Sequence, residues 1–299
     1  MSRLVPPPNH LNEETQEQFT ESGYVFTPGL LPAETVSELQ NEANELLELL
    51  VNASLYHKRN IRVFQTQSRT GKRASLRKVQ PYLDLSSTFS SFVTSEEFLK
   101  PIGQLYGDDP VLDFRSSKLN YKQPLEHPIE GLAVEEREDE FPIHSDWNYY
   151  RRNNYPEGVT TTIVFLDDVE EDSGPLQIWP GTHKEEFEHE VVDIGRQVVP
   201  GALDEYDSQT LLGPAGSVLT FDSRMVHSSS PNVSDRPRKF MISTHFPAAN
   251  ETESYNSNYD VHYFNDIARD VGDIVEYQSS VISGNGEQMW RLPESLRTD

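Results

Sequence analysis

The chain has 299 residues, and its 49 acidic side chains outnumber 25 basic ones, which gives a formal net charge of −24. Such an acid excess repels phosphate backbones and anionic lipids, so neither a nucleic-acid nor a membrane partner is expected. The absence of cysteine excludes disulfide scaffolds, thiolate metal sites, iron–sulfur clusters and thiol nucleophiles. Any metal must therefore be bound by histidine and carboxylate side chains.

The composition favours a soluble, globular protein. Hydrophobic residues make up 35% of the chain, enough for a core. No stretch approaches the ~20 apolar residues of a membrane span, and the polar, proline-rich beginning lacks the apolar segment of a signal peptide. A cytoplasmic location is expected.

The first part of the chain is predicted to be mainly helical. After a polar arm at 1–10, a short helix is expected at 12–21 and a brief strand at 24–26. A longer helix begins near Pro32, because apolar residues recur at helical spacing as far as Leu50. Two further short helices are predicted within residues 86–107, ending at a glycine.

Residues 51–80 contain no acidic residue and eight basic ones. Few apolar residues occur there, so the sequence indicates a long loop, and long loops in compact domains are often functional. Two interpretations remain open. The loop either lies solvated on the acidic surface, or it is a lid that attracts an anionic ligand, with Arg73 as a candidate substrate contact.

From residue 111 onward the pattern changes to short β-type runs separated by Gly, Pro, Asp and Ser. These runs lie at 111–122, 141–147, 159–166, 175–179, 217–221, 225–229 and 238–246. Short strands without intervening helices indicate a sandwich or barrel. We expect one domain over 1–299, in which a helical and basic-loop region (1–110) packs on a β core (111–248). An acidic loop at 126–140 and a C-terminal extension at 249–299 complete it.

The strongest chemical signal lies in the segment Phe141–Trp147. Residues two apart on a strand face the same side, so His144 and Asp146 are placed to bind one metal. His227, on another predicted strand, is the candidate for a third ligand. Two histidines and one carboxylate form the facial triad that suits non-heme Fe(II) and leaves coordination positions open.

The other histidines are weaker candidates for this third position. His245 ends an apolar strand and is expected to be a core residue. The remaining ones are expected to be exposed or lie in segments without a structural assignment, namely His10, His57, His127, His183, His189 and His262.

The order of motifs resembles the phytanoyl-CoA dioxygenase family of Fe(II)/2-oxoglutarate oxygenases. The matching segments, in chain order, are GYVFTPGLLPAETVSEL, Leu119–Pro124, His144–Trp147, Phe165–Val169, Asp172–Leu176, Pro180–His183, His227–Asn232 and Arg238. The resemblance implies a mainly β fold with flanking helices, whose core is a double-stranded β-helix of the jelly-roll, cupin-like type. It also implies Fe(II) as metal, with 2-oxoglutarate and O2 as cosubstrates.

The resemblance assigns roles to individual residues. The metal ligands and catalytic residues would be His144, Asp146 and His227, and the 2-oxoglutarate contacts would be Arg238, Ser229, Lys122 and Asn120. A guanidinium can grip a carboxylate through two parallel hydrogen bonds, which suits Arg238. Arg236 is the competitor, and its position before Pro237 places it in a turn. Where several relatives carry a tryptophan, this chain has Ile163, so no contact is assigned there.

The expected reaction is hydroxylation of an unactivated C–H bond of a small molecule, with release of succinate and CO2. Halogenating relatives lack the carboxylate that Asp146 supplies. Desaturation or ring formation, or a metal-binding cupin-like protein without oxygen chemistry, remain as alternatives. Candidate substrate contacts are Trp147, Tyr149, Arg151 and Arg152, with Arg73. The basic ones favour an anionic substrate, unless they are simply paired with surface acids.

Overall fold

The computed structural model describes residues 13–52, 62–68, 71–79, 82, 86–107, 111–122, 141–153, 156–192 and 195–250. The expected N-terminal arm, the acidic loop 126–140 and the C-terminal extension lie outside these residues, apart from a short 3-10 turn, η5 (Ala248–Asn250). Within the described chain, no helix is both long and apolar enough to cross a membrane.

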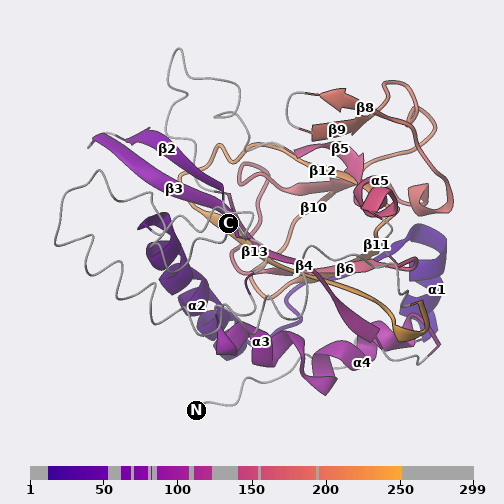
Figure 1. Ribbon diagram of the computed structural model, residues 1–299, viewed down its shortest axis with the longest axis horizontal. Coiled ribbons are helices and arrows are strands. Elements are labelled where there is room, and N and C mark those ends of the chain that lie inside the picture. The colour runs from indigo at the N-terminus through magenta and orange to yellow at the C-terminus, as the bar shows by residue number, and fades with distance from the viewer. Residues whose placement is uncertain are drawn as a thin grey trace, which may run out of the picture.

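Two antiparallel sheets face each other and form the centre of the molecule (Figure 1). The seven strands of the larger sheet are, in order, β1 (Tyr24–Thr27), β11 (Val218–Asp222), β6 (Thr160–Phe165), β13 (Arg238–Pro247), β4 (Val111–Lys122), β3 (Gly71–Val79) and β2 (Arg62–Ser68). The smaller sheet contains β10 (Gln209–Leu211), β7 (Leu176–Ile178), β12 (Val226–Ser229) and β5 (Phe141–Ser145). This arrangement confirms the predicted double-stranded β-helix.

Helices cover the outer face of the larger sheet (Figure 1). They are α2 (Ala33–Asn52), α3 (Ser87–Val93) and α4 (Glu96–Gln104), while α1 (Glu13–Ser22) precedes β1. Ser86 and Ser95 cap α3 and α4, because each side chain accepts a hydrogen bond from a backbone N–H of the first turn. The predicted helices before residue 107 are thereby confirmed.

The alternation of side chains along the strands separates two environments. Met241 of β13 and Val164 of β6 pack with the helices, in the same core as Leu39. Their neighbours Ile242 and Ile163 point the opposite way, into the space between the sheets. Residues two apart on a strand share a face, so one face of the larger sheet packs against the helices and the other face lines the pocket between the sheets.

The prediction of a long loop at 51–80 is wrong for more than half of these residues. Residues 62–68 and 71–79 form the antiparallel hairpin β2–β3, which extends the larger sheet at its edge. Polar and basic composition misled the prediction, although charged residues are common on edge strands, where they discourage pairing with other chains. The lid interpretation rests on side chains outside the described residues.

Besides β2 and β3, three short strands were not predicted. They are β10 and the hairpin of β8 (His189–Val192) with β9 (Gly195–Val198). Their sequences are short and largely polar, so no apolar alternation marks them. The hairpin β8–β9 lies beside β5 at one end of the smaller sheet, near the helix α5 (Trp147–Tyr150) (Figure 1). The remaining 3-10 turns are η3 (Arg151–Asn153) and η4 (Thr182–Lys184).

Candidate metal and cosubstrate site

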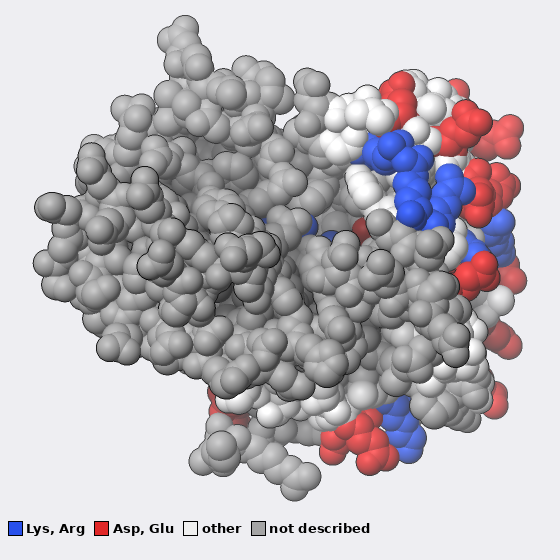
Figure 2. Space-filling view, viewed as in Figure 1, with Lys and Arg blue, Asp and Glu red and all other residues white. Residues whose placement is uncertain are grey.

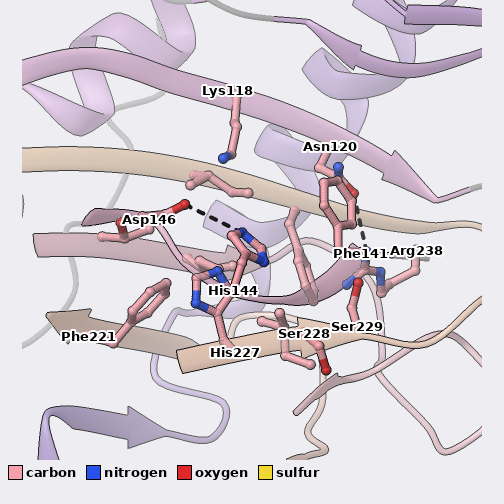
Figure 3. Close-up of a pocket in the computed structure, with 15 residues that line it drawn as sticks. Lys118, Asn120, Phe141, His144, Asp146, Phe221, His227, Ser228, Ser229 and Arg238 are labelled. Carbon is pink, nitrogen blue, oxygen red and sulfur yellow. Dashed lines mark hydrogen bonds and ion pairs between the residues drawn. The ribbon is translucent and has the colours of Figure 1, made fainter. Parts of the chain in front are cut away.

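Three predicted ligands meet between the two sheets (Figure 3). His144 of β5 and His227 of β12 are directly paired across the smaller sheet, and their ring centroids lie 4.4 Å apart. Asp146 completes the group, with ligand atoms of all three residues within 4.8 Å of one another. All three side chains are buried. Two imidazoles and a carboxylate in one buried pocket fit the donor set of a non-heme Fe(II) site.

Asp146 reaches this position by a different route from the one predicted. Strand β5 ends at Ser145, and the backbone of Asp146 has already turned into the helical region, with φ −60° and ψ −35°, at the start of α5. Its carboxylate nevertheless lies beside His144, with 3.8 Å between Oδ1 and Nε2. The side chain of Thr161 donates to Oδ2 from the opposite sheet, at 3.4 Å. The turn, rather than strand alternation, aims this ligand.

Both histidines are held in the tautomer that a metal needs. Nδ1 of His144 is 2.7 Å from the carbonyl oxygen of Pro142, and Nδ1 of His227 is 3.0 Å from that of Met225. A carbonyl only accepts, so each Nδ1 must donate its proton. This leaves the lone pair of each Nε2 available for a metal, as in metal sites whose ligands are oriented by outer partners.

Electrostatics keep the ligands in the required protonation states. Burial alone would raise the pKa of Asp146, but the Lys118 ammonium, followed by the rings of His144 and His227, outweighs it and holds the pKa below its ordinary value. Burial, with His144 alongside, lowers the pKa of His227 to about 4. A neutral imidazole and an ionised carboxylate are the forms that bind metal.

A buried arginine occupies the other end of the pocket (Figure 3). Arg238 is 1% exposed, its Nη2 donates to Oδ1 of Asn120 at 3.2 Å, and its guanidinium lies 3.8 Å from the ring centroid of Phe240. Its competitor Arg236 is exposed and forms ion pairs with Glu170 and Asp172. Of the two arginines, Arg238 lines the pocket as the first residue of β13, whereas Arg236 lies in the turn before this strand.

Lys122 and Ser229 lie close to this arginine. Lys122 is paired with Arg238 in the sheet register, and its Nζ donates to Ser229 Oγ at 2.9 Å and to the carbonyl oxygen of Ser230. Gly174 allows this approach. Its φ is +76°, and a Cβ atom there would lie 2.6 Å from both the Lys122 side chain and the Ser230 carbonyl oxygen. The four predicted cosubstrate residues therefore converge from β4, β12 and β13.

The predicted substrate contacts are less closely gathered. Tyr149 lies edge-on to the ring of His144, with 5.9 Å between centroids, and Trp147 is buried under the Arg224 guanidinium. Arg151 is exposed and bonded to Glu186, and Arg152 is exposed. Neither arginine lines the pocket. On the described part of the face shown in Figure 2, basic side chains lie next to acidic ones. Arg73 lies on β3, and its side chain is outside the description.

The sequence did not predict roles for three residues around the metal ligands. Lys118 and Thr161 line the pocket from the larger sheet. His189, expected to be exposed, is half-buried, and its Nε2 accepts the backbone N–H of Ser145, between two ligands. His183 is also half-buried. Alternation along β4 gives Lys118 the same face as Asn120, but its position relative to Asp146 depends on how the two sheets pack, which no local pattern encodes.

Comparison with known proteins identifies the family. The model of the phytanoyl-CoA dioxygenase (PhyH) family matches residues 19–240, well over half of the chain. The chain belongs to this family. A relative from Stutzerimonas stutzeri, described as a probable alpha-ketoglutarate-dependent hypophosphite dioxygenase, is 26% identical over 239 residues, 77% of this chain and 76% of the relative. The ectoine dioxygenase of Halomonas elongata is 26% identical over 241 residues, 74% of this chain and 66% of the relative.

Solved structures agree with the fold. The crystal structure of EctD from S. alaskensis with 2-oxoglutarate and 5-hydroxyectoine has a TM-score of 0.62 at 20% identity, over 84% of this chain and 85% of that one. Family, fold and donor set together make this chain an Fe(II)- and 2-oxoglutarate-dependent dioxygenase that acts on a small molecule. The predicted family, fold class, enzyme class and cosubstrates are confirmed.

Proposed function

We propose that His144, Asp146 and His227 bind Fe(II), and that Arg238 grips the C5 carboxylate of 2-oxoglutarate. The observation that carries this proposal is the distribution of polar groups in one pocket, with three ligand donors at one end and a buried guanidinium at the other. When bound there, Fe(II) would supply an oxidation in which O2 converts 2-oxoglutarate to succinate and CO2 and hydroxylates a C–H bond of the substrate.

The protein contributes orientation and a dry environment. The Nδ1 hydrogen bonds of both histidines fix the direction of each Nε2, and the pocket wall between the ends is apolar, with Ile163, Phe221 and Phe240. Low polarity strengthens the attraction between a guanidinium and a carboxylate. Lys122, through Ser229, and Asn120 support this grip, because they fix the polar groups that surround Arg238.

The proposed outcome is hydroxylation of a small, anionic molecule. Asp146 fills the ligand position that halogenating relatives leave open, which favours transfer of oxygen over transfer of a halide. Hypophosphite, for which one relative is named, is itself an oxyanion. The proposed substrate contacts are still Trp147, Tyr149, Arg151, Arg152 and Arg73. The ring contact of Tyr149 with His144 supports its place near the metal-ligand candidates.

We also infer one domain, with the N-terminal region 1–110 packed on the core 111–248 and an extension at 249–299. The family match supports this, since it runs across residue 110 without interruption. The absence of nucleic-acid and membrane partners is proposed from the net charge of −24, because it repels phosphate groups. A cytoplasmic location is a separate proposal, which rests on the absence of a predicted signal peptide in the sequence.

An anaerobic titration tests the proposed site. Wild-type protein with Fe(II) and 2-oxoglutarate is expected to develop the metal-to-ligand charge-transfer band of chelated 2-oxoglutarate. Asp146→Ala is expected to weaken Fe(II) binding by more than the roughly 10–100-fold lost with an outer-shell partner, and to abolish turnover. Asp207→Ala, which removes an exposed carboxylate, is the matched control. Absence of the band in the wild type, or wild-type turnover in Asp146→Ala, would refute the assignment.

A further inference from the structure

Lys118 is a cation at the metal end of the pocket to which the proposed function gives no role. It is half-buried on β4 and lines the same pocket as the three ligands. Figure 3 shows its side chain descending from β4 toward Asp146, at the opposite end of the pocket from Arg238. The alternation of β4 explains this direction, because Lys118 and Asn120 share the inner face whereas Leu119 packs with the helices.

Lys118 shares the pocket with all three metal-ligand candidates, and it reaches this pocket from the larger sheet, opposite the strands that carry the two histidines. Yet in the described part of the chain, Lys118 makes neither a hydrogen bond nor an ion pair within 4.0 Å. A half-buried ammonium in this position is available to a ligand that carries its own acceptor oxygens.

The charges in the pocket leave a place for one more anion. Lys118, Arg238 and Asp146 are the charged residues that line it. The two negative charges of 2-oxoglutarate would balance the two positive charges of a divalent metal ion. The negative charge of Asp146 balances one of the two cationic side chains, Lys118 and Arg238. One positive charge remains, and at the metal end it belongs to Lys118. In a pocket of low polarity this charge favours a ligand with a negative group.

The geometry separates Lys118 from the C5 carboxylate of the cosubstrate. In the pairing of β4 with β13, Lys122 is opposite Arg238, whereas Lys118 is opposite Ile242. Four residues along a strand, at about 3.3 Å each, correspond to roughly 13 Å. Lys118 therefore lies at the end of the pocket that holds the three metal-ligand candidates, and Arg238 marks the far end.

We propose that Lys118 binds an oxyanion group of the substrate and positions the substrate beside the metal. The inference rests on the proposed function, and it narrows the substrate to small molecules that carry one such group, either a carboxylate or a phosphorus oxyanion. Lys118 acts on specificity and orientation. The C–H bond that reacts then lies within a short reach of this anionic group, because the ammonium and the metal ligands share one end of the pocket.

The test compares anions with neutral partners of the same skeleton. Wild-type protein, loaded anaerobically with Fe(II) and 2-oxoglutarate, is titrated with small carboxylates and their amides, and with alkylphosphonates and their dimethyl esters. Binding is followed by the shift of the charge-transfer band and by the melting temperature. The same titrations are made on Lys118→Met, Lys118→Arg and the control Lys184→Met, which removes a surface lysine paired with Glu21.

The expected result is a preference of the wild type for anions in at least one of the two series, and the series that responds identifies the kind of oxyanion. Lys118→Met should weaken anion binding by roughly tenfold to a hundredfold, as expected for a lost charge-assisted hydrogen bond. Lys118→Arg should retain most of the affinity, and Lys184→Met all of it. The dissociation constant of 2-oxoglutarate, measured at saturating Fe(II), should stay within threefold of wild type in every variant.

Three results would overturn the inference. One is that no anion binds more tightly than its neutral partner to the wild type. Another is that Lys118→Met binds the preferred anion as tightly as the wild type does. The third is that Lys118→Met weakens 2-oxoglutarate as much as it weakens the anion, which would make Lys118 a cosubstrate contact. A wild type that develops no charge-transfer band at all would instead remove the proposed function, and this inference with it.

Discussion

Arg238 offers the sharpest test of the cosubstrate assignment, because the chain contains its own control two residues away. Arg238 is 1% exposed inside the pocket, whereas Arg236 is exposed and paired with Glu170. Replacing either by methionine removes a guanidinium and keeps an unbranched side chain of moderate length. Only Arg238→Met should change the affinity for 2-oxoglutarate, because only this arginine lines the pocket.

The expected magnitude follows from the burial of the arginine. A hydrogen bond to a charged group contributes about 1.5–3 kcal/mol, and a guanidinium can make two to one carboxylate. Truncating one member of a buried charge pair costs about 2–5 kcal/mol. A loss of about 3–5 kcal/mol corresponds to a dissociation constant for 2-oxoglutarate raised on the order of 10²–10⁴-fold. Asn120 and the ring of Phe240 hold the guanidinium in place, so little of this is spent on ordering it.

The assay is an anaerobic titration of the Fe(II)-loaded protein with 2-oxoglutarate, followed through the charge-transfer band. Fe(II) affinity and melting temperature are measured in parallel, so that a folding defect is recognised. Arg238→Lys should recover part of the affinity, since it keeps the charge without the two-pronged geometry. A dissociation constant for Arg238→Met within threefold of wild type, or an equal loss in Arg236→Met, would show that the C5 carboxylate binds elsewhere.

Two further predictions concern stability and support of the site. Neither ring nitrogen of His245 has a hydrogen-bond partner in the described chain, and burial lowers its pKa from 6.5 to about 3. The unfolded state binds a proton at His245 below pH 6.5, but the folded state does not, so the free energy of unfolding falls as the pH is lowered from 7.5 to 5. His245→Leu should remove about 2 kcal/mol of this pH-dependent loss, measured by urea unfolding at both pH values. An equal loss in wild type and variant would contradict the prediction. Gly174→Ala, whose Cβ would meet Lys122 and Ser230, should raise the 2-oxoglutarate dissociation constant at least several-fold and lower the melting temperature, while Gly107→Ala, with open space around it, should leave the affinity unchanged.

The sequence predicted the ligands more securely than it predicted how they are aimed. A histidine and a carboxylate two residues apart predicted a shared metal, and the structure brings the two side chains together although Asp146 has left the strand. The pairing of His144 with His227 is a contact across strands far apart in the chain, and no local pattern fixes its register. The resemblance to the family predicted that this histidine belongs with His144, because His227 and Arg238 follow the other motifs in the order found in that family.

Contacts made by short, irregular segments could not be predicted from the sequence. His189 supports the backbone of Ser145 from the hairpin β8–β9, whose strands are short and polar and carry no apolar alternation. Alternation along a strand gives Lys118 the same face as Asn120, but only the packing of the two sheets brings its charge near Asp146. The hairpin β2–β3 was missed because composition, rather than periodicity, was used to interpret it.

The interior reverses the sign of the surface, and this reversal has a functional meaning. The chain carries a net charge of −24, yet its buried charged side chains in the described residues are three cations, Lys122, Arg238 and Lys239, and one carboxylate, Asp146. Lys239 is matched by Asp167 on the helix side of the sheet. Arg238 and half-buried Lys118 line the pocket, and Lys122 donates a hydrogen bond to Ser229 in the pocket wall. Burying cations costs free energy that anionic ligands can offset. A pocket of this kind is therefore complete only when a dicarboxylate and a substrate anion occupy it.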